Sequence, residues 1–128
     1  MCRRGYGSEK SRRDPRRLVS LGARTTRVAK MLPRTDEGRY ITQQLMRAGL
    51  APAPNYAGAQ AAENRADFIH KLRIALKELN ETKSWPAQIG VKCLFSRDKM
   101  AAIIAENQEL GWILAASIKT ARGSSSPI

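Results

Sequence analysis

The segment from Asn64 to Trp85 constrains the fold most, because its apolar residues have the spacing of one helical face. Residues three and four positions apart lie on the same side of an α-helix. The apolar positions with this spacing are Phe68, Leu72, Ala75, Leu76 and Leu79. Asn64 can cap the helix by accepting a backbone N–H bond, and Asp67 favours the positive end of the helix dipole. The segment therefore predicts a long amphipathic helix over residues 65–91, with one face buried.

Two further helices are predicted before this segment. Asp14 followed by Pro15 has the form of an N-cap with proline at the first helical position, which predicts a helix over residues 15–32. Its seam positions are Leu18, Leu21, Thr25, Val28 and Leu32. A second helix is predicted over residues 38–62, after a turn at residues 35–38. Proline removes a backbone donor, so we expect a break at residues 52–54.

The long helix is expected to bend near Pro86, for the same reason. A fourth helix, capped by Ser96, is predicted over residues 97–122. Its heptad positions hold Met100, Ile103, Leu110, Leu114 and Ala121, with Asn107 and Ser117 at two others. An Asn in an apolar seam can fix helix register, although a surface-facing or water-linked side chain is the alternative. Short connections make successive helices antiparallel neighbours, so the fold class is all-α, an antiparallel up-down-up-down four-helix bundle.

Three stretches of the chain resemble the 23S rRNA intervening-sequence proteins. They are RVAKMLPRTDEGRYITQQLMRAG at 27–49, NYAGAQAAENRADFIHKL at 55–72 and ILAASIKTAR at 113–122. The resemblance covers roughly residues 21–122. It implies a four-helix bundle that forms a ring-like homopentamer without established catalytic activity, and a related protein is the basic partner of a reverse transcriptase in diversity-generating retroelements. The doubled proline of APAP and Gly58, where the family usually has Glu, depart from the family pattern.

Positive charge is concentrated at the N-terminal end. The formal net charge is +12, and eleven Lys and Arg against two acids up to Arg34 account for +9 of it. Residues 1–13 are almost free of apolar side chains, so we expect a disordered basic arm, followed by a bundle domain over residues 14–122 and a disordered tail over 123–128. The alternative for the arm is a solubilising tail or a wrongly assigned start codon.

Cations of this kind favour nucleic acid, because phosphate contacts release condensed counterions. The candidate binding residues of the arm and of the first helical turn are Arg3, Arg4, Lys10, Arg12, Arg13, Arg16 and Arg17. A second candidate is the stripe of His70, Arg73 and Lys77, whose spacing places it on one side of the long helix. The alternative for this stripe is a solvated charged face, since Glu78 and Glu81 lie close in sequence.

Motifs for enzymatic chemistry are missing from the sequence. A di-metal bundle site needs two Glu-x-x-His pairs, whereas the chain has one His. There is no nucleophile elbow and no phosphate-binding P-loop, so we expect no enzyme, metal or cofactor. Cys2 and Cys93 lack metal-ligand spacing and are expected to be reduced thiols. No segment has the roughly 20 apolar residues of a membrane span, and we expect a cytoplasmic protein without membrane association.

Three classes of function remain. The first is a non-catalytic oligomer, expected to be a homopentamer, that associates with RNA or DNA through its basic surface and arm. The second is a protein-interaction scaffold, such as an accessory partner of a reverse transcriptase. The third is an enzyme of unrecognised type. The small residues of 57–62 suit close helix packing, either within the chain or between subunits.

Overall fold

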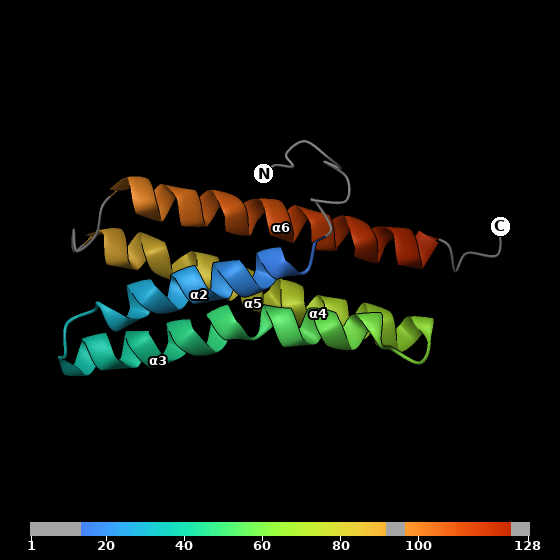
Figure 1. Cartoon of the computed structure of the whole chain (residues 1–128), viewed down its shortest axis with the longest axis horizontal. Helices are drawn as coiled ribbons and strands as arrows, with labels where there is room; N and C mark the ends of the chain where they lie inside the picture. The colour runs from blue at the N-terminus through green and yellow to red at the C-terminus, as the bar shows by residue number, and fades with distance from the viewer. Residues whose placement is uncertain (1–13, 92–96, 124–128) are drawn as a thin grey trace.

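The chain forms helices throughout the part that the computed structural model describes, which is residues 14–91 and 97–123. The helices are α2 (Arg16–Lys30), α3 (Asp36–Leu50), α4 (Pro52–Gln60), α5 (Arg65–Val91) and α6 (Arg97–Gly123). Figure 1 shows that α3 and α4 follow one another along one line, and that the chain turns back between α2 and α3 and again between α4 and α5. The all-helical prediction is confirmed for these residues. The predicted arm at 1–13 and the Ser96 cap lie outside them, and α6 extends to Gly123, where the tail was predicted to start.

Polar side chains begin three of the helices. The Asp14 carboxylate accepts a hydrogen bond from the Arg16 backbone N–H at 2.9 Å, and the Asn64 side-chain oxygen accepts one from Asp67 N–H at 2.8 Å. The Asn64 cap is therefore confirmed. Asp14 accepts the predicted kind of hydrogen bond, but α2 begins at Arg16 with Pro15 at its N-cap position, one residue later than predicted. The prediction for α3 was wrong by two residues, because Thr35 is the cap: its hydroxyl oxygen accepts from Gly38 N–H at 3.0 Å. Residues 36–38 thus form the first helical turn, where a turn was expected.

Two proline sites behave differently. The break predicted at residues 52–54 occurs one residue earlier, at Ala51, since α3 ends at Leu50 and α4 begins at Pro52, so residues 52–54 are helical. Ala51 between them keeps helical angles, with φ −76° and ψ −33°, so the join is a kink and not a loop. The Ala51 carbonyl accepts from both the backbone and the side-chain nitrogen of Asn55, at 3.2 and 2.9 Å. At Pro86, by contrast, α5 does not end and continues to Val91.

All of the helices contribute to one apolar core. The predicted seam of α2 and the apolar face of α5 are buried or packed against the core, and in α6 Met100, Ile103, Leu110 and Leu114 are buried as predicted. The heptad assignment was wrong after Leu114, because Ile118 is buried there while Ser117 is only half-buried. An α-helix has 3.6 residues per turn, so a seam counted in sevens drifts off the buried face over several turns.

Polar side chains are also buried within this core. Thr25, Thr82 and Asn107 come from three different helices, each is 2 % exposed, and they line one small cavity. The Thr82 hydroxyl donates to the Glu78 carbonyl at 2.7 Å. The Thr25 hydroxyl and the Asn107 amide nitrogen have no hydrogen-bond partner among the described residues. Because Asn107 is buried, the surface-facing alternative for its side chain is excluded.

Helices α2 and α3 approach each other closely at two glycines. A Cβ atom added to Gly22 would lie 2.8 Å from the Gly49 carbonyl oxygen, and one added to Gly49 would lie 2.8 Å from a Thr25 methyl carbon. Both separations are shorter than van der Waals contact. At its other end the pair is joined by Thr42, whose hydroxyl lies 3.0 Å from the Ala29 carbonyl oxygen on α2. Glycine is therefore needed here for close packing of the two backbones.

We predict that Gly22→Ala destabilises the protein by about 1–3 kcal/mol, because the added methyl group must push the two helices apart. The matched control is Gly111→Ala in α6, where the added Cβ would find its nearest neighbour, Leu76, at an ordinary 3.7 Å. This control should range from neutral to about 1 kcal/mol more stable, since alanine favours a helix over glycine. Urea denaturation of both variants measures the difference. Equal effects at the two sites would contradict the close approach.

Candidate nucleic-acid interface

Helix α2 has five basic residues and no acidic ones. They are Arg16, Arg17, Arg24, Arg27 and Lys30. Arg27 and Lys30 lie in the last turn, where cations interact favourably with the negative end of the helix dipole. The core-facing side of α2 is apolar, so its cations point to the sides of the helix or outwards. The physical question is which of them are balanced by acids elsewhere.

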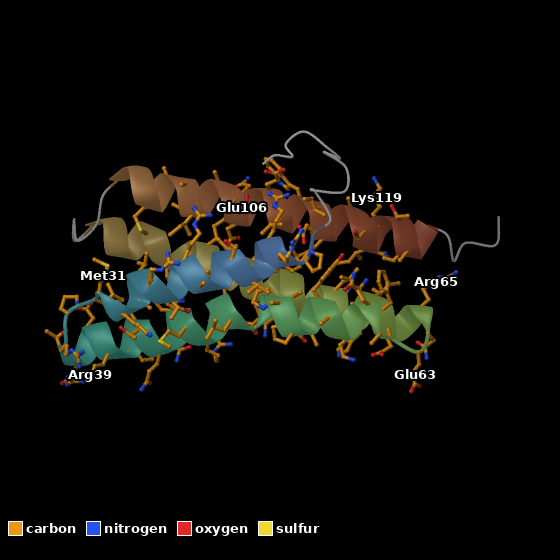
Figure 2. The ribbon with its side chains drawn as sticks, in the orientation of Figure 1. Met31, Arg39, Glu63, Arg65, Glu106 and Lys119 are labelled. Carbon is orange, nitrogen blue, oxygen red and sulfur yellow. The ribbon has the colours of Figure 1, made fainter. Side chains whose placement is uncertain are left out.

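The first two of these cations, both predicted binding residues, are paired with acids. Arg16 forms an ion pair of 2.7 Å with Asp14 at the start of its own helix. Arg17 donates to both carboxylate oxygens of Glu106 on α6, at 2.9 and 2.8 Å, and also lies 3.2 Å from Glu109. Figure 2 shows Glu106 on the side of α6 that faces α2. Arg17 is therefore part of the α2–α6 packing, and its charge is largely compensated.

These contacts also change the protonation of the acids. The hydrogen bond from Arg17 holds the pKa of Glu106 below its ordinary value of 4.5, and burial of the carboxylate opposes the effect only in part. The hydrogen bond to Glu106 correspondingly raises the pKa of Arg17. At the helix start, the side-chain and backbone hydrogen bonds from Arg16 lower the pKa of Asp14. Both carboxylates are thus ionised at neutral pH.

The other cations of this region form what we call the α2 ridge, which is Arg24, Arg27, Lys30 and Arg34. Arg27, Lys30 and Arg34 are exposed, and Arg24 is half-buried. Within residues 14–91 and 97–123, none of the four is seen in an ion pair. Arg24 is close enough to Glu106 to lower its pKa slightly. The ridge therefore presents to solvent three exposed cations without an ion pair to a described acid, beside Arg24, whose charge Glu106 offsets in part.

Beside the end of the ridge lies an open hollow of about 410 Å³, which we call the corner hollow. It is lined by Ala29, Lys30, Leu32, Pro33, Arg34, Arg39, Thr42 and Gln43. Arg39 has a fixed position here, because its guanidinium donates to the Arg34 carbonyl at 2.9 Å and to Asp36 at 2.8 Å. Figure 2 shows Arg39 at the end of the molecule where α2 and α3 are connected.

The stripe predicted on α5 is exposed at all three positions, His70, Arg73 and Lys77. The acids near it in sequence point elsewhere: both Glu78 and Glu81 form ion pairs with Arg47 of α3. The stripe does not join the α2 ridge. Helices α2 and α5 each pack against α3, α4 and α6, so they occupy diagonal corners of the bundle. The structure therefore separates the predicted residues into two surfaces.

The predictions for the arm and the cysteines concern residues that the structure does not describe, whereas those for metal sites and membrane spans can be compared with the described residues. The predicted arm residues Arg3, Arg4, Lys10, Arg12 and Arg13, together with both cysteines, lie outside the described residues. Among the residues that are described, no group of three His, Cys, Asp or Glu side chains could hold a metal ion. Within the same part of the chain, no helix is long and apolar enough to cross a membrane.

Comparison with known proteins identifies the family. The sequence pattern of the family described as "23S rRNA-intervening sequence protein" matches residues 16–116. The chain belongs to this family. A crystal structure of a protein of unknown function from the S23 ribosomal protein family of Bacteroides thetaiotaomicron is similar, with 30% sequence identity and a TM-score of 0.75. The likeness covers 82% of this chain and 97% of that one. No curated protein matches.

The 23S rRNA-intervening sequence family match and the structural neighbour name no catalytic activity. Neither states a ligand. The family match begins at Arg16, so it includes the α2 ridge and excludes the predicted arm. The residues on which a function can be argued from described structure are therefore those of the bundle.

Sequence reasoning missed the ridge residues Arg24, Arg27, Lys30 and Arg34 in this member of the family. The sequence shows an excess of positive charge up to Arg34, but the predicted binding residues in this part of the chain were those of the arm and of the first helical turn. A usable signal was present, since residues 16–34 contain six basic side chains and no acid. Nothing local, however, shows that Arg17 is compensated while Arg27 is not, because the acids that pair with Arg17 lie 89 and more residues away.

We predict that the Arg17 contact contributes to stability and not to ligand binding. A double-mutant cycle of Arg17→Met and Glu106→Gln should give a coupling of about 1 kcal/mol at neutral pH, as for a part-buried bidentate pair. Because the folded pKa of Glu106 is lowered, this coupling is present above pH 4.5 and is lost as the pH falls through the folded pKa. Urea denaturation at pH 7 and at successively lower pH measures it, and absence of coupling at pH 7 would contradict the pair.

Proposed function

We propose that this 23S rRNA-intervening sequence protein is a non-catalytic cytoplasmic protein that binds the phosphate backbone of RNA or DNA. The observation that carries the proposal is the α2 ridge, whose four cations form no ion pair with a described acid. Phosphate contacts supply most of the affinity of sequence-independent binding. The basic arm would extend the contact, because it precedes α2 directly in the sequence.

Backbone recognition is favoured over base recognition by the kind of side chains present. The ridge consists of Arg and Lys and contains no aromatic residue on which a base could stack. The two large exposed aromatic side chains in the described residues, Tyr40 and Trp112, belong to α3 and α6. Contacts to phosphate position a protein on nucleic acid without reading its sequence. We therefore propose binding with little sequence preference.

The salt dependence of binding tests this proposal. Each phosphate contact contributes about 0.7–0.9 to the slope of log affinity against log salt, so Arg24→Gln with Arg27→Gln should lower the slope by about 1 to 2. The matched control is Arg73→Gln with Lys77→Gln, which removes the same charge from the opposite corner. It should change the slope less. Filter binding of a short RNA and a short DNA across a salt series measures both variants.

The basic arm is compared in the same assay. Deleting residues 1–13 should flatten the slope more than the α5 control does, because the arm carries five cations that can adapt to any backbone. Arg17→Met should leave the slope unchanged, because its charge is already compensated. Absence of binding at low salt, or affinity that does not depend on salt, would reject nucleic-acid binding in favour of the second candidate.

The second candidate is a protein-interaction scaffold that self-associates and binds a protein partner such as a reverse transcriptase. One surface favours it. Trp112 is 65% exposed, and Ala101, Ala105 and Ala116, at helical spacing from it on α6, are exposed as well. An exposed apolar surface of this kind is typical of protein contacts. Repeating weak basic patches in an oligomer would also strengthen nucleic-acid binding, so the two candidates are compatible.

We predict self-association, with five subunits as the family resemblance implies. Multi-angle light scattering at tens of micromolar should give about five times the chain mass of 14.2 kDa. The variant Trp112→Gln should reduce the measured mass if the exposed α6 face is a subunit contact. A mass of 14.2 kDa for the unaltered protein would reject self-association.

A further inference from the structure

We propose that the corner hollow between α2 and α3 is a binding site for the phosphate group of a nucleotide. The proposal rests on the proposed function insofar as the nucleotide is part of a strand lying on the α2 ridge. It adds a specific recessed site to what is otherwise an exposed row of cations.

The charge of the hollow matches a phosphate group. Lys30, Arg34 and Arg39 line it together, and no acidic residue is among the lining side chains. Asp36 compensates Arg39 in part, at 2.8 Å, whereas neither Lys30 nor Arg34 has an ion-pair partner among the described residues. Two uncompensated cations balance the charge of a phosphomonoester, about −1.5 to −2 at neutral pH, and exceed the single negative charge of each phosphodiester in a strand. Cations that converge on one hollow also hold an anion better than separate surface charges do.

The volume of the hollow and the apolar part of its lining also fit the rest of a nucleotide, beyond its phosphate group. The hollow has a volume of about 410 Å³, within the roughly 300–1,000 Å³ of small-molecule sites. Pro33 is exposed and forms the apolar part of its wall, with the buried Ala29 and Leu32 behind it, and Gln43 adds an exposed amide. This combination suits a ligand with one anionic end and one less polar end. The phosphate would contact the three cations, with the sugar against the apolar wall.

The site is held in place by contacts inside the protein. The Arg39 guanidinium is oriented by hydrogen bonds to the Arg34 carbonyl and to Asp36, although both side chains of the Arg39–Asp36 pair are exposed. The Thr42 hydroxyl, also in the lining, lies within hydrogen-bonding distance of the Ala29 and Gly38 carbonyl oxygens at 3.0 and 2.8 Å. It thereby links the two helices that form the walls. A site assembled before binding needs no rearrangement of the backbone.

Calorimetric titration of the full chain with adenosine monophosphate, inorganic phosphate and adenosine tests the site. Adenosine monophosphate and inorganic phosphate should bind, and adenosine, which has no phosphate group, should not. Lys30→Gln with Arg34→Gln should weaken nucleotide binding at least tenfold. The matched control is Arg65→Gln with Lys119→Gln, which removes equal charge from exposed positions outside both the hollow and the ridge and should change the affinity less than twofold. Unchanged unfolding temperatures show that each variant is folded.

Failure of the test has clear forms. The corner hollow is not a site if phosphate fails to bind at concentrations up to about 10 mM, on the order of the weakest affinity expected for a site of this kind. Equal weakening of binding in both variant pairs would overturn the site as well. Competition with a ten-nucleotide RNA identifies the source: displacement of the nucleotide assigns the hollow to a strand, and simultaneous binding assigns it to a free nucleotide. Nucleotide binding without RNA binding would reject the proposed function and leave the site standing. RNA binding without nucleotide binding would overturn the hollow as a site and leave the proposed function standing.

Discussion

The close contact between α2 and α3 determines where a positive surface can form in this protein. At Gly22 and Gly49 the backbones meet without intervening side chains, and near the turn Thr42 connects the two helices through the Ala29 carbonyl. This packing leaves the outward side of α2 uncovered. It also brings Arg39 of α3 beside Lys30 and Arg34, although the sequence separates these residues by several positions and a change of chain direction. The ridge and the hollow both depend on this single helix pair.

Interactions between neighbours in sequence could be predicted, and interactions across the bundle could not. The hydrogen bonds of Asp14 and Asn64 at the helix starts span two or three residues, so residue type alone identified them. The buried faces followed from apolar spacing, up to the point in α6 where counting in sevens diverged from 3.6 residues per turn and selected Ser117 in place of Ile118. The kink before Pro52 was predictable because proline acts on its own backbone.

The candidate site shows the limit of such reasoning. Arg16, Arg17, Arg24 and Arg27 lie in the same helix, and composition does not distinguish them. Only the packing of α6 against α2 shows that Glu106 compensates Arg17. Conversely, Glu78 and Glu81 lie close to the α5 stripe in sequence, but in the structure both form ion pairs with Arg47 of α3. Which charges are balanced is a property of tertiary structure, because the partners come from other helices.

The lack of acids in α2 also links ligand binding to folding. Arg24, Arg27 and Lys30 follow at spacings of three, and like charges this close on a helix repel by about 0.2–0.5 kcal/mol per pair. Within α2 no acidic side chain offsets this repulsion, so the order of the helix depends strongly on docking against α3 and α6. Under the proposed function, a polyanion lying along α2 would relieve this repulsion in the folded chain. Occupancy of the ridge would then stabilise the bundle to the extent that the folded chain binds the polyanion more strongly than the unfolded chain does.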